Sequence, residues 1–276
     1  MPLPYLEVRE IPIGRLTIAP FGILVSSAVL VGSFLSVRRA VKRGLPRARM
    51  ESLASYILIF GFVLSHVLDV LMYRPRDALR NPLELLMLWK GISSYGGFIG
   101  CAVGVLVWKY IKKEPILPYG DQVSAMFPVA WIFGRAGCAT AHDHIGRLSN
   151  SPLAVAFPDG TFYPPGARFD LGLIEMLLTI PLALTMVWYS RKPRRAGAIT
   201  GVLCMLYAPM RFPLDALRAT DIAGADARYG GLTPAQWLSL ALFAYGAYLL
   251  YRSRTQPVIG DDVAEPVPEP RPSGSG

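Results

Sequence analysis

The sequence predicts an all-α membrane protein with seven transmembrane helices. Of its 276 residues, 53% are hydrophobic and only 17% are charged, and the mean hydropathy is +0.38. Soluble domains are usually about 45–50% apolar and about 25% charged. Seven apolar stretches approach the roughly 20 residues that a helix needs to span a bilayer. They cover residues 20–37, 53–72, 92–111, 122–139, 170–190, 198–217 and 234–251.

Two of these stretches depart from a regular spanning helix. The fourth, 122–139, is short, and the sixth, 198–217, contains Pro209 and Pro213. We expect both to be bent or partly unwound, because a proline frees backbone groups that neighbouring helices or cavity water must satisfy.

The connection between the fourth and fifth stretches, residues 140–169, is predicted to form a small segment outside the membrane. Pro-Asp-Gly at 158–160 and Tyr-Pro-Pro-Gly at 163–166 are turn signals. The alternation around 153–157 favours one short strand or extended segment.

Basic residues predict the orientation of the chain. Because cytoplasmic loops are enriched in Lys and Arg, the side that carries the basic clusters is the cytoplasmic one. The N-terminus is then outside and the C-terminus inside. The clusters follow the first, third, fifth and seventh stretches and consist of Arg38, Arg39, Lys42, Arg43, Arg47 and Arg49; Lys109, Lys112 and Lys113; Arg191, Lys192, Arg194 and Arg195; and Arg252 and Arg254.

The chain divides into a membrane domain, residues 1–254, and a C-terminal tail, residues 255–276. The tail is rich in Pro, Glu, Asp and Gly, which predicts a disordered cytoplasmic segment. The net charge of +9 does not indicate a nucleic-acid binder, because the basic residues lie in short clusters between apolar runs.

Several polar side chains that are unfavourable inside a membrane are predicted to lie at one depth of the bilayer. Arg135 and Arg211 lie inside apolar segments, and an intramembrane charge indicates a functional site. With the orientation above, both arginines and all three histidines belong to the outer leaflet. Two arginines at headgroup depth suit a phosphodiester, and a histidine beside a carboxylate suits proton transfer. The further members of this group are His66, Asp69, His142, Asp143, His144 and Asp215.

Structural interpretations of the same residues stay open. Arg211 and Asp215, one helical turn apart, form a structural ion pair in the simplest reading. His66 and Asp69 could hold two helices together, and Tyr95 could be an interfacial belt residue. We expect Arg147 and Arg168 to be solvated loop charges.

A metal site is a further alternative for the histidines. His142 and His144 could share one ligand face in an extended segment, with His66 as a third nitrogen ligand. Neither a cysteine cluster nor an HExxH helix accompanies them. We therefore predict no metal, and we expect Cys101 and Cys204 to be small buried hydrophobes.

The motifs resemble one known family, the bacterial prolipoprotein diacylglyceryl transferases. The resemblance covers residues 18 to 250 approximately. It rests on Phe133-Gly134-Arg135-Ala136-Gly137 with Gly146 nine residues later, Ser94-Tyr95-Gly96-Gly97 at a helix start, and Tyr207 with Arg211, Asp215 and Arg218. The resemblance implies seven spans in the inner (plasma) membrane with the N-terminus outside. It also implies transfer of a diacylglyceryl group from phosphatidylglycerol to the lipobox cysteine of a preprolipoprotein, with release of glycerol phosphate and without a cofactor.

The sequence departs from the family pattern at several positions. Cys138 stands where the family has asparagine, Tyr95 replaces a histidine, Phe21 replaces a tyrosine, and Asp143 replaces a glutamate. Of the family's His-Pro-x-Gln-x-Tyr-Glu, residues 169–175 keep only Glu175.

The predicted site therefore combines a phosphate clamp with a rearranged set of proton-handling groups. The catalytic candidates are Arg135, Arg211, His142, Asp143 and His144, and either histidine could be the base. The substrate-binding candidates are His66, Asp69, Tyr95, Gly96, Gly97, Gly137, Cys138, Gly146, Tyr207 and Asp215. A related enzyme with another acceptor or hydrolytic, metal-assisted chemistry, and a non-catalytic lipid-binding protein, are the alternatives.

Overall fold

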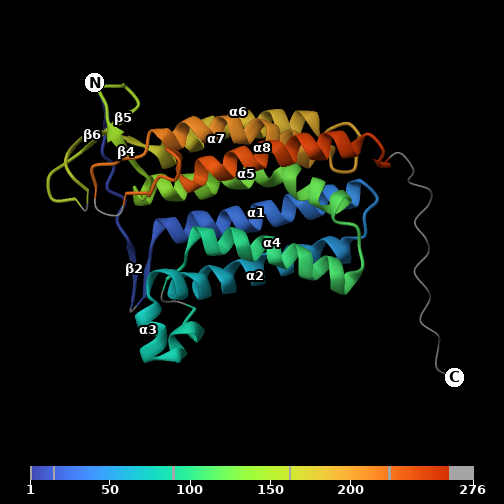
Figure 1. Ribbon diagram of the computed structural model, residues 1–276, viewed down its shortest axis with the longest axis horizontal. Coiled ribbons are helices and arrows are strands. Elements are labelled where there is room, and N and C mark those ends of the chain that lie inside the picture. The colour runs from blue at the N-terminus through green and yellow to red at the C-terminus, as the bar shows by residue number, and fades with distance from the viewer. Residues whose placement is uncertain (1, 15, 89–90, 162, 223–224, 261–276) are drawn as a thin grey trace. The chain divides into compact units, whose positions relative to one another are not determined.

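The structure is a computed structural model that describes residues 2–14, 16–88, 91–161, 163–222 and 225–260, and it is mostly helical (Figure 1). Each predicted stretch corresponds to a long helix. Three of these helices, α1, α2 and α6, are long and apolar enough by composition alone to cross a membrane. The chain is thus a largely helical membrane protein. The long helices are α1 (Pro20–Lys42), α2 (Arg47–Tyr73), α4 (Ser94–Lys112), α5 (Ile116–Ala141), α6 (Leu171–Tyr189), α7 (Ala198–Ala216) and α8 (Pro234–Ser253).

The chain forms two compact units, which we describe separately. The first contains residues 1–36 and 120–258, and the second contains 37–119 and 259–276. In the first unit, α5, α6, α7 and α8 run alongside one another, and a small sheet lies at one end of them (Figure 1). Buried side chains of α5, α6 and α7 form the core between these helices, namely Ala125, Met126, Leu182, Met186 and Ile199.

The small sheet shows that the all-α prediction is too narrow. Its strand order is β1 (Leu3–Pro4), β5 (Ala154–Phe157), β6 (Gly166–Asp170) and β4 (Ile145–Leu148), and only the β1–β5 pair is parallel. The extended segment expected around 153–157 is β5. The other strands escaped prediction because two- to five-residue strands show little alternation, and partners such as β1 and β5 are far apart in the sequence. A separate hairpin joins β2 (Ile11–Ile13) to β3 (Leu16–Ile18).

Capping side chains fix where the helices of the first unit begin. The Asp170 carboxylate accepts a hydrogen bond from the backbone N–H of Leu173, so β6 leads directly into α6. Thr233 and Gln236 form a reciprocal capping box at the start of α8, with Pro234 at its first position. Both caps lie next to residues of the site described below.

The fourth and sixth stretches are more regular than predicted. Helix α5 has 26 residues, and α7 continues through Pro209 and Pro213 without a break, so partial unwinding was a wrong expectation. Gln236 of α8 donates a hydrogen bond to the Phe212 carbonyl at 3.3 Å. A side chain of the neighbouring helix thus serves a backbone group within the proline-containing stretch.

In the second unit, α2 and α4 pack with their backbones in close contact. A Cβ added at Gly96 would lie 2.6 Å from the Leu64 carbonyl oxygen, and one at Gly100 would lie 2.3 Å from that of Phe60. Small residues four apart allow such backbone contact between helices. A short helical arm follows α2, made of α3 (Pro75–Arg80) and the 3-10 helix η1 (Pro82–Leu86).

The described residues continue past the predicted boundary at residue 254 and end at residue 260. Ala196, next to β7 (Arg194–Arg195), donates its backbone N–H to the Pro257 carbonyl at 2.9 Å. Arg195 Nη1 donates to the carbonyls of Arg254 and Gln256. The strand β8 (Val258–Ile259) follows. The rest of the predicted tail, from residue 261, lies outside the described residues.

Candidate active site

A buried carboxylate joins the two arginines that the sequence singled out. Glu175 of α6 lies between Arg135 of α5 and Arg211 of α7 and is 1% exposed. Its Oε2 is 3.1 Å from Arg135 Nε and 3.9 Å from Arg211 Nε. Although it is buried, Arg135 Nε makes no hydrogen bond of suitable geometry within the part of the chain that the structure describes. The cluster therefore holds a donor that is not fully used.

The other oxygen of Glu175 is held by two uncharged donors. The Tyr207 hydroxyl donates to Oε1 at 2.6 Å, and the Trp131 indole donates to it at 3.2 Å. The guanidinium carbon of Arg135 also lies over the Trp131 ring, 4.4 Å from the ring centroid. Since Tyr207 precedes Arg211 by one turn and Trp131 precedes Arg135 by one turn, each helix supplies one arginine and one uncharged partner.

Asp215 is the second counter-ion of Arg211. Arg211 Nη2 donates to Asp215 Oδ1 at 3.1 Å, and the Thr233 hydroxyl at the start of α8 donates to Asp215 Oδ2. Asp215 is completely buried. The ion pair suggested by the four-residue spacing is thus present, but Arg211 also faces Glu175 and belongs to a larger cluster.

Arg135 connects this cluster to the histidine-containing turn that follows α5. Its Nη1 lies 3.4 Å from His144 Nε2 and 3.7 Å from Cys138 Sγ. An arginine only donates, so His144 Nε2 accepts and His144 Nδ1 carries the proton. Nδ1 then donates to Asp143 Oδ1 at 2.5 Å. In this tautomer the lone pair of His144 Nε2 is directed at the guanidinium.

His142 has a different environment from His144. Its Nδ1 is 2.6 Å from Asp170 Oδ2, and its Nε2 is 3.2 Å from the Leu6 carbonyl. The Tyr5 ring stacks on it at 4.4 Å. Burial lowers the pKa of His142, but the bonds to Asp170 and Leu6 raise it more, so the net pKa is above its ordinary value. Both ring nitrogens face acceptors, which favours the imidazolium form.

Comparison with known proteins places the chain in a family. The model of the prolipoprotein diacylglyceryl transferases matches residues 10–252. The chain belongs to the prolipoprotein diacylglyceryl transferase family. It is 32% identical to the phosphatidylglycerol–prolipoprotein diacylglyceryl transferase of Bordetella bronchiseptica over 89% of this chain and 95% of that protein. Proteins of the same name from Bordetella avium and Nitratidesulfovibrio vulgaris are 32% and 29% identical, over 92% and 91% of this chain and 98% and 95% of theirs.

Two glycines of the transferase motif serve close packing. A Cβ added at Gly146 would lie 2.7 Å from Phe169 Cβ and 2.9 Å from the Leu217 carbonyl oxygen. One at Gly137 would meet the Phe21 ring at 3.2 Å. These positions bring β4 against β6 and α5 against the start of α1, and this packing fixes the turn that carries His144.

The remaining candidates lie in the second unit, where they make their own contacts. His66 is fully buried, and its ring nitrogens bond to the carbonyls of Gly91 at 2.9 Å and Glu84 at 2.8 Å. Asp69 accepts from Arg74 at 2.8 Å. His66 and Asp69 are therefore not partners of each other, because each is engaged elsewhere. Gly96 and Gly97 open α4, and the side chain of Tyr95 lies outside the described residues.

One described group of side chains in the transferase has metal-ligand character. The ligand atoms of Cys138, Asp143 and His144 all lie within 4.8 Å of one another. Arg135 already donates toward both Cys138 Sγ and His144 Nε2. A metal ion would have to compete with the positively charged guanidinium for the same lone pairs. The group therefore fits the arginine better than a metal ion.

Sequence reasoning missed four residues of this transferase site. Glu175 was noted as a family match but was not chosen, although a lone carboxylate in an apolar stretch is itself a signal. Trp131, Asp170 and Thr233 carry no such signal, because only the packing of the helices reveals what their polar atoms contact.

The expectation that Arg168 is a solvated loop charge was wrong. Arg168 is 2% exposed rather than solvated, and its guanidinium contacts Asp221 with two nitrogens at 3.0 and 2.5 Å. This forked pair ties β6 to the loop after α7. Arg147 is exposed, as expected.

Proposed function

We propose that the chain transfers the diacylglyceryl group of phosphatidylglycerol to the lipobox cysteine thiol of a preprolipoprotein and releases glycerol phosphate. Membership of the family and the name shared by the relatives support this reaction. The observation that carries it in the structure is the buried Arg135–Glu175–Arg211 group with its unused Arg135 donor. The substrate phosphate is the anion that such a group suits.

Arg135 and Arg211 are proposed to hold the phosphodiester of the lipid. Guanidinium groups bind phosphate oxygens with paired N–H donors, and they stabilise charge that develops on a leaving phosphate. The two arginines come from α5 and α7, so the rigid packing of these helices sets their separation before the lipid binds.

His144 is the better of the two candidate bases. Its Nε2 holds a lone pair, and the contact from Arg135 at 3.4 Å is long for a hydrogen bond. When the phosphate recruits Arg135, that lone pair becomes available to the acceptor thiol. Asp143, bonded to Nδ1, stabilises the imidazolium that forms. His142 lacks such a lone pair, because both of its nitrogens face acceptors.

The reaction then balances without a cofactor. The thiol passes its proton to His144 Nε2, and the sulfur attacks the diacylglycerol carbon that carries the phosphate ester. A C–S bond forms, the C–O bond breaks, and the leaving oxygen keeps the electron pair as part of glycerol phosphate. Only the thiolate is a good nucleophile, so loss of the proton accompanies attack.

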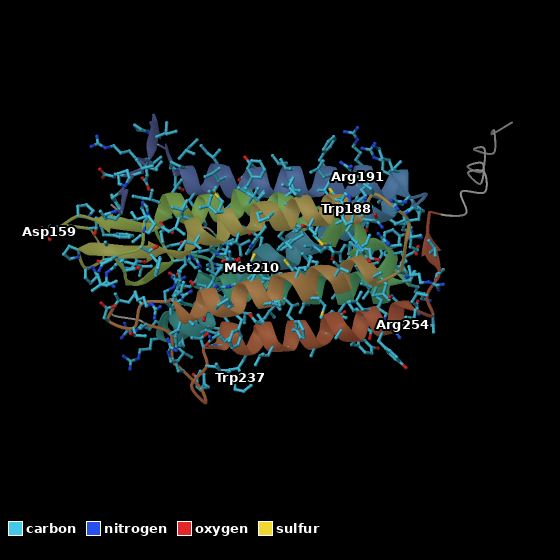
Figure 2. All side chains as sticks on the ribbon, turned by 90° about the horizontal axis from the view of Figure 1, so that it is seen from above. Asp159, Trp188, Arg191, Met210, Trp237 and Arg254 are labelled. Atoms are coloured by element: carbon cyan, nitrogen blue, oxygen red, sulfur yellow. The ribbon has the colours of Figure 1, made fainter. Side chains whose placement is uncertain are left out.

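A seven-span topology in the inner membrane is part of the proposal, with the N-terminus outside. Asp159 lies at one end of the first unit, whereas Arg191 and Arg254 lie at the opposite end (Figure 2). Because basic residues are enriched on the cytoplasmic side, this arrangement supports an orientation with the sheet and the histidine turn outside. The lipid then reaches the arginines from the outer leaflet.

The other candidates receive supporting roles in this proposal. Tyr207 and Asp215 orient the arginines, and Cys138 lies beside the reacting groups. His66, Asp69, Tyr95, Gly96 and Gly97 stay proposed substrate-binding residues.

The decisive experiment is complementation of a bacterium depleted of its own transferase, read out as lipidation of a model lipoprotein. Wild-type chain should restore lipidation. Arg135→Ala and Arg211→Ala should each reduce activity by about a hundredfold or more, since each removes a donor to the developing phosphate charge. Arg147→Ala, at an exposed arginine, is the matched control and should retain activity.

Two outcomes would contradict the proposal. Inserted wild-type protein that binds a lipobox peptide but leaves it unmodified would point to another acceptor or to a non-catalytic role. Equal activity of all three arginine variants would contradict phosphate binding by Arg135 and Arg211.

A further inference from the structure

The four side chains of Arg135, Arg211, Glu175 and Asp215 together carry no net charge, and Arg218, which lies 3.9 Å from Asp215, has its own counter-ion in Asp226. Arg135 and Arg211 contribute two positive charges, and Glu175 and Asp215 contribute two negative ones. All four side chains are at least 88% buried, since the most exposed of them, Arg211, has a side-chain exposure of 12%. A site that simply maximised anion affinity would leave the arginines without buried counter-ions. The presence of two carboxylates therefore needs a reason.

The charge of the bound phosphate changes during the reaction. Phosphatidylglycerol is a phosphodiester with one negative charge. Glycerol phosphate is a phosphomonoester, which carries about −1.5 to −2 charges at neutral pH. Two unopposed arginines would hold this product more tightly than the substrate, because the attraction grows with the charge of the anion.

We propose that Glu175 is a positioning residue that keeps the arginine pair from trapping the glycerol phosphate product. This inference rests on the proposed placement of the phosphate between Arg135 and Arg211. Glu175 shares both guanidiniums with the incoming phosphate, so it weakens the site for the product dianion and returns the arginines to their positions after release.

The contacts of Glu175 suit this role. Tyr207 and Trp131 both donate to Oε1, which anchors the carboxylate, while Oε2 faces the two arginines. A carboxylate anchored in this way stays beside the arginines when the phosphate arrives. Asp215 differs, because it faces Arg211, Arg218 and Thr233 and makes no described contact with Arg135.

The test compares Glu175→Gln, Glu175→Asp and Asp159→Asn. Gln keeps the size of the side chain but removes its charge. Asp keeps the charge but, being one methylene shorter, holds it farther from the two arginines. Asp159 is an exposed residue in the loop after β5, so its substitution changes the net charge of the protein equally but outside the site. Each purified protein is assayed for kcat, for KM of phosphatidylglycerol, and for inhibition by added glycerol phosphate.

Glu175→Gln should lower the inhibition constant of glycerol phosphate about tenfold, with a smaller fall in KM for the lipid. Removing the negative charge of Glu175 strengthens the attraction of the arginines for a dianion more than for a monoanion. The kcat of this variant should fall because product leaves slowly. Glu175→Asp should lower the inhibition constant about threefold, and Asp159→Asn should leave it unchanged. A purely structural role for Glu175 would reduce the amount of folded enzyme without tightening product binding.

An inhibition constant for glycerol phosphate that is unchanged or higher in folded Glu175→Gln would overturn the inference. If that variant does not fold, an unchanged constant in Glu175→Asp would overturn it equally. Arg135→Ala and Arg211→Ala distinguish failure of the role of Glu175 from failure of phosphate binding by the arginines. If they weaken glycerol phosphate binding while Glu175→Gln leaves it unchanged, the phosphate clamp holds and only the role of Glu175 falls. If they leave it unchanged, both fall.

Discussion

At the scale of single residues, His142 and His144 show how neighbours decide what a side chain can do. They are two positions apart, yet His142 bonds to a carboxylate and a carbonyl, whereas His144 accepts from Arg135. The first arrangement favours a charged ring that ties segments together. The second directs a ring-nitrogen lone pair at the arginine cluster.

Substitution of the two histidines should therefore have opposite consequences. His144→Gln should lower kcat by about a hundredfold, because it removes a general base while a side chain of similar reach remains. His142→Gln should retain most of the kcat of the folded enzyme but lose stability. The comparison requires kinetics and thermal unfolding on the same preparations, and loss of kcat only in His142→Gln would reverse the assignment.

The stability that His142 supplies should depend on pH. Because its pKa is raised in the folded state, its protonated form stabilises the fold fully below its ordinary pKa of about 6.5. That contribution is lost as the pH rises through the raised value. The melting temperature of His142→Gln should thus differ from wild type more at about pH 5.5 than at about pH 9. A difference that is constant across this range would show that His142 contributes only packing.

At the scale of elements, the close approach of α2 and α4 depends on glycine rather than on hydropathy. Gly100 leaves room for the Phe60 carbonyl of the facing helix. Hydropathy predicted both helices correctly but could not reveal this contact, because it belongs to the pair and not to either segment.

Gly100→Ala should destabilise the protein by about 1–3 kcal/mol, since the added methyl group meets backbone that cannot turn away. Gly22→Ala in α1 is the matched control, because no atom lies within 4 Å of the added Cβ. Thermal unfolding in detergent measures both variants. Equal melting temperatures would indicate that α2 and α4 can separate without cost.

At the scale of the whole molecule, the distribution of charge predicts how the chain is oriented in the membrane. The basic clusters predict which ends of the helices face the cytoplasm, and Figure 2 places Asp159 at the opposite end of the first unit from Arg191 and Arg254. In the proposed orientation the sheet lies on the outer side, where the proposed lipid and thiol substrates would meet.

Cysteine labelling in intact cells tests the orientation. Asp159→Cys should react with a membrane-impermeant thiol reagent from outside, whereas Lys192→Cys should react only after the cytoplasmic face is opened. Wild-type chain measures the background from Cys101, Cys138 and Cys204, of which the first two are partly exposed. Labelling of Lys192→Cys from outside would invert the topology.

The sequence by itself predicted the helical membrane class and the positions of the long helices, and it singled out the two arginines that meet in the structure. Each follows from local composition, because a charge in an apolar stretch is costly wherever that stretch lies. Only the tertiary structure decided which groups meet. Glu175 between two arginines, Arg168 with Asp221, and His142 with the N-terminal segment join residues that are distant in the chain. The partner of a buried polar group is chosen by helix packing and strand pairing, and a single sequence carries no direct record of either.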